Sequence, residues 1–279
     1  MADLSSCKIA FIGGGNMASA IIGGLLSANK IPKSHVSVSA PSEATRSSHA
    51  ARGVTVTPSN VEAATGAHVV VIAVKPAIAK SVCEELRGAW DKLAEHPIII
   101  SVAAGTTVGA MREWLGGGRV SVVRVMPNTP SLVGEGAAGV YAEDVDDSQR
   151  GLVNGILSSM CRVVEWVDKE ELINVVTSVS GSGPAYFFAM VEHMTASAKA
   201  MGLPADQAAR LAQQTCLGAG RMMSESEDDA GQLRRKVTSP NGTTHAALVS
   251  FEKLGFADIV DKSMKACVER GEELGKAYG

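Results

Sequence analysis

The residues with the clearest chemical potential lie in a short glycine-rich loop near the amino terminus. Gly13, Gly15 and Ala18 have the spacing Gly-x-Gly-x-x-Ala, between the apolar run 8–12 and an Ala/Ile/Leu-rich helical pattern that reaches Leu26. A strand that turns sharply into a helix needs one glycine for the turn, a second for the approach of a phosphate, and a small residue for close packing. The N–H groups and the helix dipole would hold a pyrophosphate. The pattern predicts a dinucleotide site, and an ordinary glycine-rich turn is the weaker alternative.

A second loop, residues 239–244, could bind an anion. Its proline fixes one turn, its glycine permits a tight one, and Thr243 and Thr244 supply hydroxyls at the start of a helical pattern at His245. Backbone N–H groups that converge at a helix start can bind a carboxylate. A simple capped turn between helices is the alternative interpretation. We interpret His245 as structural rather than as a general acid, because a histidine in a first helical turn is more often structural.

The elements that must position these loops alternate between strand and helix patterns up to residue 168. Such alternation is typical of a doubly wound parallel sheet of the Rossmann type. The predicted strands are residues 8–12, 36–39, 54–56, 69–74, 97–102, 120–125, 139–142 and 162–166, with a helix at 147–159. We expect a dinucleotide-binding domain over residues 1–168.

From residue 169 onward only helical periodicity remains, which predicts an all-helical dimerisation and substrate-binding domain over residues 169–279. The predicted helices are residues 170–179, 185–201, 205–224, 245–254 and 257–277. The run 181–184, Gly-Ser-Gly-Pro, is expected to break a helix into two. These apolar helices have more surface than a small unit can bury, which favours an intertwined dimer over packing on the first domain alone.

The ends of the predicted strands suggest which cofactor binds. After the second strand come Ser39 and Ala40, and the first acid is Glu43. An acid at that strand end holds the ribose hydroxyls of NAD and would repel a 2′-phosphate, so its absence favours NADP. The alternative, in which Glu43 reaches back and NADH binds equally well, stays open. Lys75 follows the central strand, the small residues 103–105 leave room for a flat ring, and Asn128 presents a polar side chain.

Composition excludes several other classes of function. The 26 basic and 29 acidic side chains nearly balance, and aromatic residues make up 4%, so neither nucleic acid nor a membrane is an expected partner. The five cysteines are scattered without ligand spacing, so we expect neither a metal site nor a disulfide framework. The longest apolar runs are too short to span a bilayer, and the amino terminus has no recognisable signal or transit peptide. We therefore expect an intracellular protein.

Several runs of the sequence resemble one enzyme family along nearly the full length. They are F-I-G-G-G-N-M-A at 11–18, A-V-K-P at 73–76, S-V-A-A-G at 101–105, R-V-M-P-N-T-P at 124–130, V-S-G-S-G-P-A-Y at 179–186 and V-T-S-P-N-G-T-T at 237–244. The chain is similar to pyrroline-5-carboxylate reductases, and the last two runs are the most specific. One departure is Asn241-Gly242-Thr243, where many relatives have Gly-Gly-Ala or Gly-Gly-Thr. Asparagine tolerates left-handed backbone angles, so the loop should keep its shape.

The resemblance implies reduction of the small molecule 1-pyrroline-5-carboxylate to L-proline by NADPH, with NADH as the other possible donor. It also implies a homodimer through the helical domain and a decamer of five dimers as a possible larger assembly. The sequence itself favours a cytoplasmic location and leaves a mitochondrial one open. Thr244 would be the catalytic residue, near the ring nitrogen. The expected substrate contacts are Glu227, Ser239, Asn241, Gly242, Thr243 and Thr244. The expected cofactor contacts are Ile12, Gly13, Gly15, Asn16, Met17, Ser39, Ala40, Asn60, Ala73, Val74, Lys75, Pro76, Ala103, Ala104 and Asn128.

Two other functions are alternatives to that of the reductase. A 3-hydroxyacid or 6-phosphogluconate type dehydrogenase needs a lysine on the first helix after the cofactor domain to take the alcohol proton. Residues 185–198 contain no lysine, and Lys199 is too far along the helix. A nucleotide-sensing protein without turnover is the second rival. Oxidation of NADPH in the presence of pyrroline-5-carboxylate would separate the reductase from both.

Overall fold

The computed structural model describes residues 4–90, 96–117 and 120–278, so residues 1–3 and 279, at the outer ends of the two predicted domains, lie outside it. The chain divides into two compact units. Unit 1 contains the residues up to Ser182 and those from Cys267 onward, and unit 2 is Gly183–Ala266. The predicted domain boundary at residue 168 follows the last strand, whereas the division by compactness falls at Ser182 and assigns the end of the final helix to unit 1.

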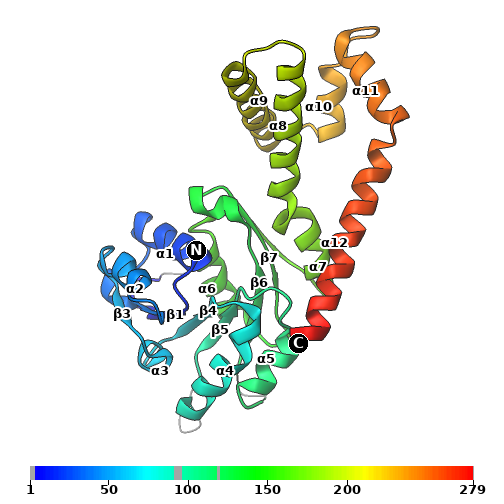
Figure 1. The fold of residues 1–279 in the computed structure, drawn as a ribbon. Coiled ribbons are helices and arrows are strands. Elements are labelled where there is room, and N and C mark those ends of the chain that lie inside the picture. Colours follow the sequence, from blue (N-terminus) through cyan, green and yellow to red (C-terminus); the bar gives the residue numbers. More distant parts are fainter. Residues whose placement is uncertain (1–3, 91–95, 118–119, 279) are drawn as a thin grey trace. The chain divides into compact units, whose positions relative to one another are not determined.

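Unit 1 is built on an eight-stranded sheet with the order β3-β2-β1-β4-β5-β6-β7-β8 (Figure 1). Strands β1 to β6 are parallel, β7 is antiparallel to β6, and β8 is parallel to β7. The predicted doubly wound sheet is confirmed. Its strand order reverses beside β1, since β2 lies on one side and β4 on the other, and ligands of such folds bind at the carboxyl ends of the strands next to this point. The strands are β1 (Ile9–Ile12), β2 (Val36–Ser39), β3 (Thr55–Thr57), β4 (Val69–Ile72), β5 (Ile98–Ser101), β6 (Val122–Met126), β7 (Gly136–Tyr141) and β8 (Cys161–Trp166).

Helices cover both faces of this sheet, and the central strands are apolar because each face is buried. Phe11 of β1 packs into one core with helices α1 and α6, while its neighbour Ile12 packs into the other core with α3, α4 and α5. Alternate residues of a strand point to opposite faces, so a strand covered twice reads as a continuous apolar run. The helices are α1 (Asn16–Ser27), α2 (Glu43–Ala50), α3 (Asn60–Ala64), α4 (Pro76–Trp90), α5 (Val108–Trp114) and α6 (Asp147–Leu157), with 3-10 helices η1 (Lys33–His35) and η2 (Thr129–Val133).

The remainder of the chain is helical, as predicted from residue 169 onward. Unit 1 adds α7 (Leu172–Val176) and the π-helical segment η3 (Thr177–Gly181). Unit 2 contains α8 (Gly183–Ala200), α9 (Ala205–Glu225), α10 (Ala230–Lys236) and α11 (Thr243–Lys253). Helix α12 (Phe256–Tyr278) begins in unit 2 and ends in unit 1.

The run 181–184 contains the predicted break between two helices, but the break is short. The segment η3 ends at Gly181, α8 begins at Gly183, and Ser182 lies between them with φ −90° and ψ −19°. A π-helical turn accommodates an extra residue just before this point. The short helix α10 was not predicted. Asp229 caps the amino-terminal end of α10 in a capping box with Gln232, and this capping pattern lies within a strongly polar stretch of the sequence.

Because two cysteines of unit 1 are buried, we expect the stability of the folded protein to vary with pH in the alkaline range. Burial raises the pKa of the Cys7 thiol from 9.0 to about 11, and burial with the nearby charge of Glu84 raises that of Cys83 to about 12. The folded thiols keep their protons above pH 9.0, whereas an unfolded chain loses them. We expect the free energy of unfolding to be intact below that pH and to fall above it, by up to about 1.4 kcal/mol per pH unit for each thiol.

This alkaline loss is measurable by urea denaturation across the same pH range. The variant Cys83→Ala should start less stable at neutral pH, because it leaves a cavity, but should lose less stability as the pH rises. An unchanged dependence on pH in Cys83→Ala would show that this thiol does not titrate as its burial requires.

Candidate functional site

The glycine corner, residues 12–17, joins β1 to α1 at the carboxyl edge of the sheet. Gly13 has φ +97°, and a Cβ there would lie 2.5 Å from the carbonyl oxygen of Ala73. Two backbone hydrogen bonds fix this arrangement: the Gly13 N–H donates to the Ser39 oxygen at 2.9 Å, and the Ala73 N–H donates to the Ile12 oxygen at 2.8 Å. The structure therefore brings together predicted cofactor residues from β1, β2 and the end of β4.

The start of α1 is open for an anion. Gly15 precedes the helix in an extended conformation, no side chain caps it, and the first turn carries no acidic residue. A Cβ at Gly15 would have no atom within 4 Å, and both Gly15 and Asn16 are exposed. Free N–H groups at a positive helix end suit a pyrophosphate, so the residues present fit a dinucleotide.

A histidine that the sequence gave no reason to select supports the glycine corner from behind. His49 of α2 is 1% exposed, and its Nε2 lies 2.9 Å from the Gly14 carbonyl oxygen. A Cβ on Gly14 would come within 3.0 Å of the His49 ring and 2.7 Å of Thr45 Cγ2. Close packing from α2 thus requires glycine at position 14, where the Gly-x-Gly-x-x-Ala pattern allows any residue.

The end of β2 is neutral and tightly hydrogen-bonded. The Ser39 hydroxyl donates to Asn60 Oδ1 at 2.7 Å, and Asn60 Nδ2 donates to Glu85 Oε2 at 2.7 Å. Arg46 of α2 donates to the carbonyl oxygens of Ala40 and of the following proline, both at 2.7 Å. These contacts link the predicted cofactor residues Ser39, Ala40 and Asn60 to Arg46 and to Glu85. No local pattern in the sequence indicated that Glu85 would bond to Asn60.

Other predicted cofactor residues lie on loops at the same edge of the sheet. Ala73 and Val74 lie just beyond β4, where the predicted strand was two residues too long, and Lys75 is exposed before Pro76 opens α4. Ala103 is buried and Ala104 is exposed after β5. Asn128 has a mainly structural amide, because it donates to the Ser180 oxygen at 3.1 Å and accepts from the Ala137 N–H at 2.9 Å.

The predicted substrate loop lies in unit 2. Its Gly242 N–H donates to the Ser239 oxygen at 3.0 Å, and Asn241 adopts the left-handed φ of +59° that the sequence led us to expect it to tolerate. Thr243 and Thr244 are exposed in the first turn of α11, which has neither a side-chain cap nor an acidic residue. This helix start can therefore accept a carboxylate. Glu227 is exposed between α9 and α10.

Among the described residues, no group of three or more His, Cys, Asp or Glu side chains could hold a metal ion. All five cysteines are free. No helix within the described ranges is long and apolar enough to cross a membrane.

The sheet, the open glycine corner and the appended helices define a dinucleotide-dependent oxidoreductase of the Rossmann class. Comparisons with known proteins make this more specific. A family model described as "Pyrroline-5-carboxylate reductase dimerisation" matches residues 170–274, and one described as "NADP oxidoreductase coenzyme F420-dependent" matches residues 8–105. The second match covers the glycine corner and the first five strands of the sheet.

Several relatives match nearly the full length of the chain. The pyrroline-5-carboxylate reductase of Pseudomonas aeruginosa is 43% identical over 277 residues, which is 99% of this chain and 100% of the relative. The solved reductase of Coxiella burnetii is 40% identical with a TM-score of 0.90, over 97% of this chain and 99% of the other. The Plasmodium falciparum enzyme, solved with NADP bound, is 31% identical with a TM-score of 0.83 over the same shares.

The chain belongs to the pyrroline-5-carboxylate reductase family. It is an oxidoreductase that reduces 1-pyrroline-5-carboxylate to L-proline with a pyridine nucleotide.

Proposed function

We propose that the two open helix starts divide the work of this reduction. The start of α1 holds the pyrophosphate of NADPH, and the loop 239–244 holds the carboxylate of pyrroline-5-carboxylate. The observation that carries the proposal is that α1 and α11, one from each unit, begin with a glycine, no side-chain cap and no acid in the first turn. Both ligands are anionic at the point of contact, and a first-turn carboxylate would repel them.

In the proposed site the chain aligns the reactants and supplies little acid–base chemistry. The protonated ring C=N is already electrophilic at carbon, and bound NADPH supplies a hydride to that carbon. The N–H groups at Thr243 and Thr244 hold the carboxylate, and the Thr244 hydroxyl accepts a hydrogen bond from the ring N–H. The nitrogen keeps its proton as the C=N bond becomes single. Such positioning accounts for most of the expected rate enhancement, and Glu227 adds a carboxylate facing the cationic ring.

The remaining predicted cofactor contacts keep the roles assigned from the sequence. Asn60, with Ser39 and Ala40, lies at the ribose end, and Lys75, Ala103 and Ala104 line the rest of the cofactor. Because β2 ends in Ser39 rather than in an acid, and Arg46 lies beside this end, we favour NADPH as the preferred donor, with NADH as a weaker one. The NADP-bound Plasmodium falciparum relative agrees with this preference. Comparing kcat/KM for the two reduced cofactors tests it.

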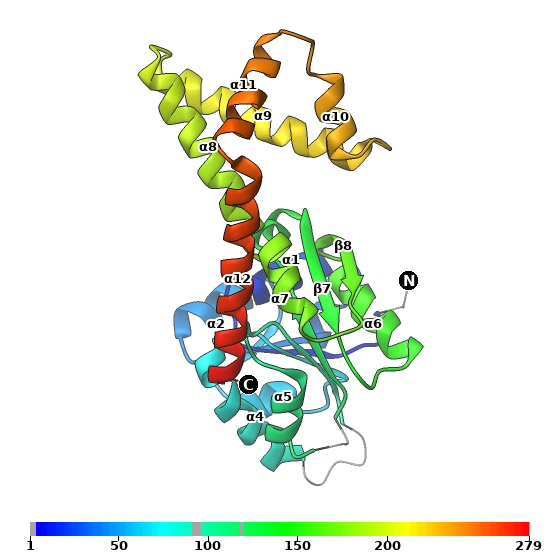
Figure 2. The same ribbon diagram turned by 90° about the vertical axis from the view of Figure 1, so that its right-hand side faces the viewer.

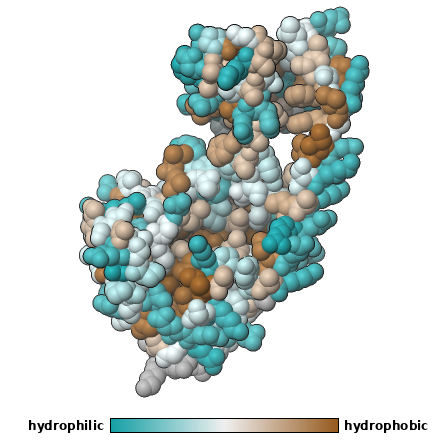
Figure 3. Space-filling model, viewed as in Figure 1, coloured by the Kyte–Doolittle hydropathy of each residue, from teal (hydrophilic) through white to brown (hydrophobic). Residues whose placement is uncertain are grey.

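The proposed assembly is a homodimer through unit 2. Among residues 183–266, burial is confined to Gly183, Ala208 and Ala212, so the unit has almost no core of its own. Apolar side chains, brown in Figure 3, lie exposed on its helices, and a surface of this kind marks an interface. The resemblance to the family extends the proposal to a decamer of five dimers, which sedimentation can test. Free cysteines suit a reducing cytoplasm, and fractionation would distinguish it from mitochondria.

Replacing Thr244 by alanine tests the substrate loop. We expect kcat/KM for pyrroline-5-carboxylate to fall about 10- to 100-fold, because one positioned hydrogen bond of roughly 1.5–3 kcal/mol is lost. The matched control is Ser250→Ala, another exposed hydroxyl on α11, which should behave as the parent. Steady-state oxidation of NADPH measures both. Parent-like kinetics in Thr244→Ala would refute its assigned role, and NADPH binding without turnover in the parent would favour a nucleotide sensor.

A further inference from the structure

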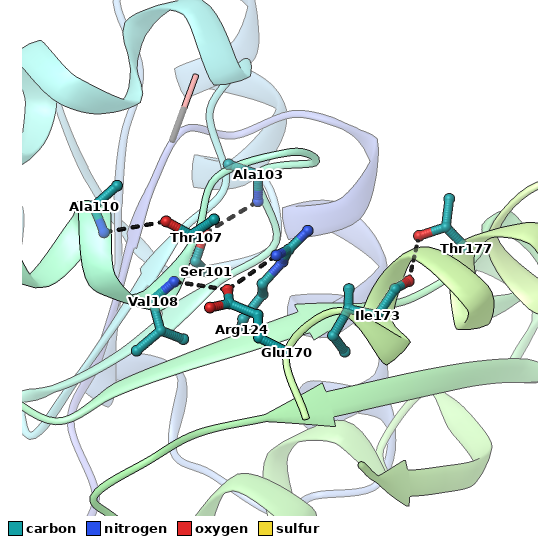
Figure 4. A network of polar contacts seen from close by, with 9 residues as sticks. All are labelled: Ser101, Ala103, Thr107, Val108, Ala110, Arg124, Glu170, Ile173 and Thr177. Carbon is teal, nitrogen blue, oxygen red and sulfur yellow. Dashed lines mark hydrogen bonds and ion pairs between the residues drawn. The ribbon is translucent and has the colours of Figure 1, made fainter. Parts of the chain in front are cut away.

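The loop between β5 and α5, residues 102–107, carries Ala103 and Ala104 and is held at both ends by hydrogen bonds to hydroxyl groups. The Ala103 N–H donates to Ser101 Oγ at 3.3 Å, and the Ala110 N–H donates to Thr107 Oγ1 at 3.1 Å (Figure 4). These bonds fix the two ends of the loop to the strand before it and the helix after it.

A third hold comes from a carboxylate that is distant in the sequence. Glu170 Oε1 accepts a hydrogen bond from the Val108 N–H at 2.8 Å and forms an ion pair with Arg124 NH1 at 2.9 Å. Figure 4 shows both donors converging on this one oxygen. The side chains of Arg124 and Glu170 are 8% and 19% exposed, so solvent screens the pair weakly. Glu170 thereby satisfies an amide in the first turn of α5 while Arg124 fixes its direction.

The opposite side of the loop lies against the end of α12, within unit 1. Gly105 has φ +80°, and a Cβ on it would lie 3.1 Å from Leu274 Cβ. Figures 1 and 2 both show the carboxyl end of α12 beside α5. Cavities of about 40 Å³ and 320 Å³ adjoin Arg124, the larger one also lined by Glu170 and Lys276. The loop is therefore held by the polar contacts of Glu170 on one side and by packing against Leu274 on the other.

We propose that Glu170 is a positioning residue for the cofactor: it holds Ala103 and Ala104 in the conformation that receives the nicotinamide, and Arg124 aligns Glu170 for this task. The inference rests on the proposed function, in which Ala103 and Ala104 line the cofactor. If the loop is already ordered before binding, the cofactor binds without the loss of entropy that ordering the loop would cause. Loss of Glu170 should therefore weaken NADPH binding more than substrate binding.

Steady-state kinetics of two variants test this role. Glu170→Ala should raise the KM for NADPH about tenfold, the loss expected for one charge-assisted hydrogen bond, with the KM for pyrroline-5-carboxylate within about twofold of the parent. Glu170→Gln still offers an acceptor to the Val108 N–H, so its KM for NADPH should rise only about threefold. The matched control is Glu171→Ala, the exposed neighbouring carboxylate, which should leave both KM values unchanged.

Hydrogen exchange of the peptide containing Val108 gives an independent readout in the ligand-free protein. Exchange should be faster in Glu170→Ala than in the parent and Glu171→Ala. A fall in kcat with both KM values unchanged would indicate only a loss of folded enzyme and would overturn the proposal, as would parent-like exchange. If Glu170→Ala does not fold, an unchanged KM for NADPH in Glu170→Gln overturns it. Failure of the proposed function looks different, because the parent itself would then either not bind NADPH or not oxidise it with pyrroline-5-carboxylate.

Discussion

Replacing Gly15 by valine should weaken NADPH binding about 100-fold or more while the protein stays folded. The backbone of Gly15 (φ −73°, ψ −168°) suits a β-branched residue, and a Cβ there meets nothing within 4 Å. The branched side chain would instead occupy the space where a phosphate approaches the free N–H groups of α1. Loss of two such charge-assisted hydrogen bonds corresponds to about 3 kcal/mol or more.

Stability provides the control for this variant. Valine is a poorer helix cap than glycine, so the free energy of unfolding should fall by only about 1 kcal/mol. Gly23→Ala lies on the same helix, and its Cβ would make an ordinary 3.7 Å contact with Arg52; it should bind NADPH as the parent does. Titration calorimetry measures each affinity. If folded Gly15→Val binds NADPH as the parent does, the pyrophosphate does not bind at the start of α1.

The amino-terminal fold could be predicted because local pattern and tertiary environment agree there. Ile9–Ile12 and Val69–Ile72 are apolar at every position since both faces of the sheet are covered, and the glycine corner follows directly from its spacing. Strand ends were harder to place. Ala73 and Val74 continue the apolar run, but the pairing of β4 with β1 ends at Ile72.

What the sequence could not reveal was a set of contacts between distant segments. Glu170 is 46 residues from Arg124 and 62 from Val108, and His49 is 35 residues from Gly14. No local spacing connects such pairs, because the fold brings them together. The same limit applies to Asn128, whose amide bonds Ala137 and Ser180 across the fold, while its contact with the cofactor stays a prediction. From the sequence alone, an asparagine that binds a ligand cannot be distinguished from one whose amide stabilises the fold.

The apolar side chains of helix α8 explain why the sequence of the helical region predicts a partner subunit. Phe187, Phe188 and Met190 are 57%, 67% and 37% exposed in the single chain. Phe187 and Phe188 lie about 100° apart around the helix axis, so one packed face cannot cover both. A helix that is apolar on several sides is normally buried, and unit 2 has too few neighbours to do this alone. The second copy of the chain is the occupant that the dimerisation match supports.

Phe188→Asp should dissociate the proposed dimer. In an isologous interface each substitution occurs twice, and removal of two phenylalanine contacts of about 2 kcal/mol each raises the dissociation constant about 1000-fold, before any burial of charge. Sedimentation at micromolar concentration should then show a monomer with parent-like helix content, since Phe188 contributes little to the fold of one chain. Activity should fall with the dimer, because the resemblance to the family implies that Glu227 acts near the subunit interface. Val163→Asp replaces a 48% exposed side chain on β8 and should remain dimeric and active; an unchanged dimer in Phe188→Asp would exclude this face of α8 from the interface.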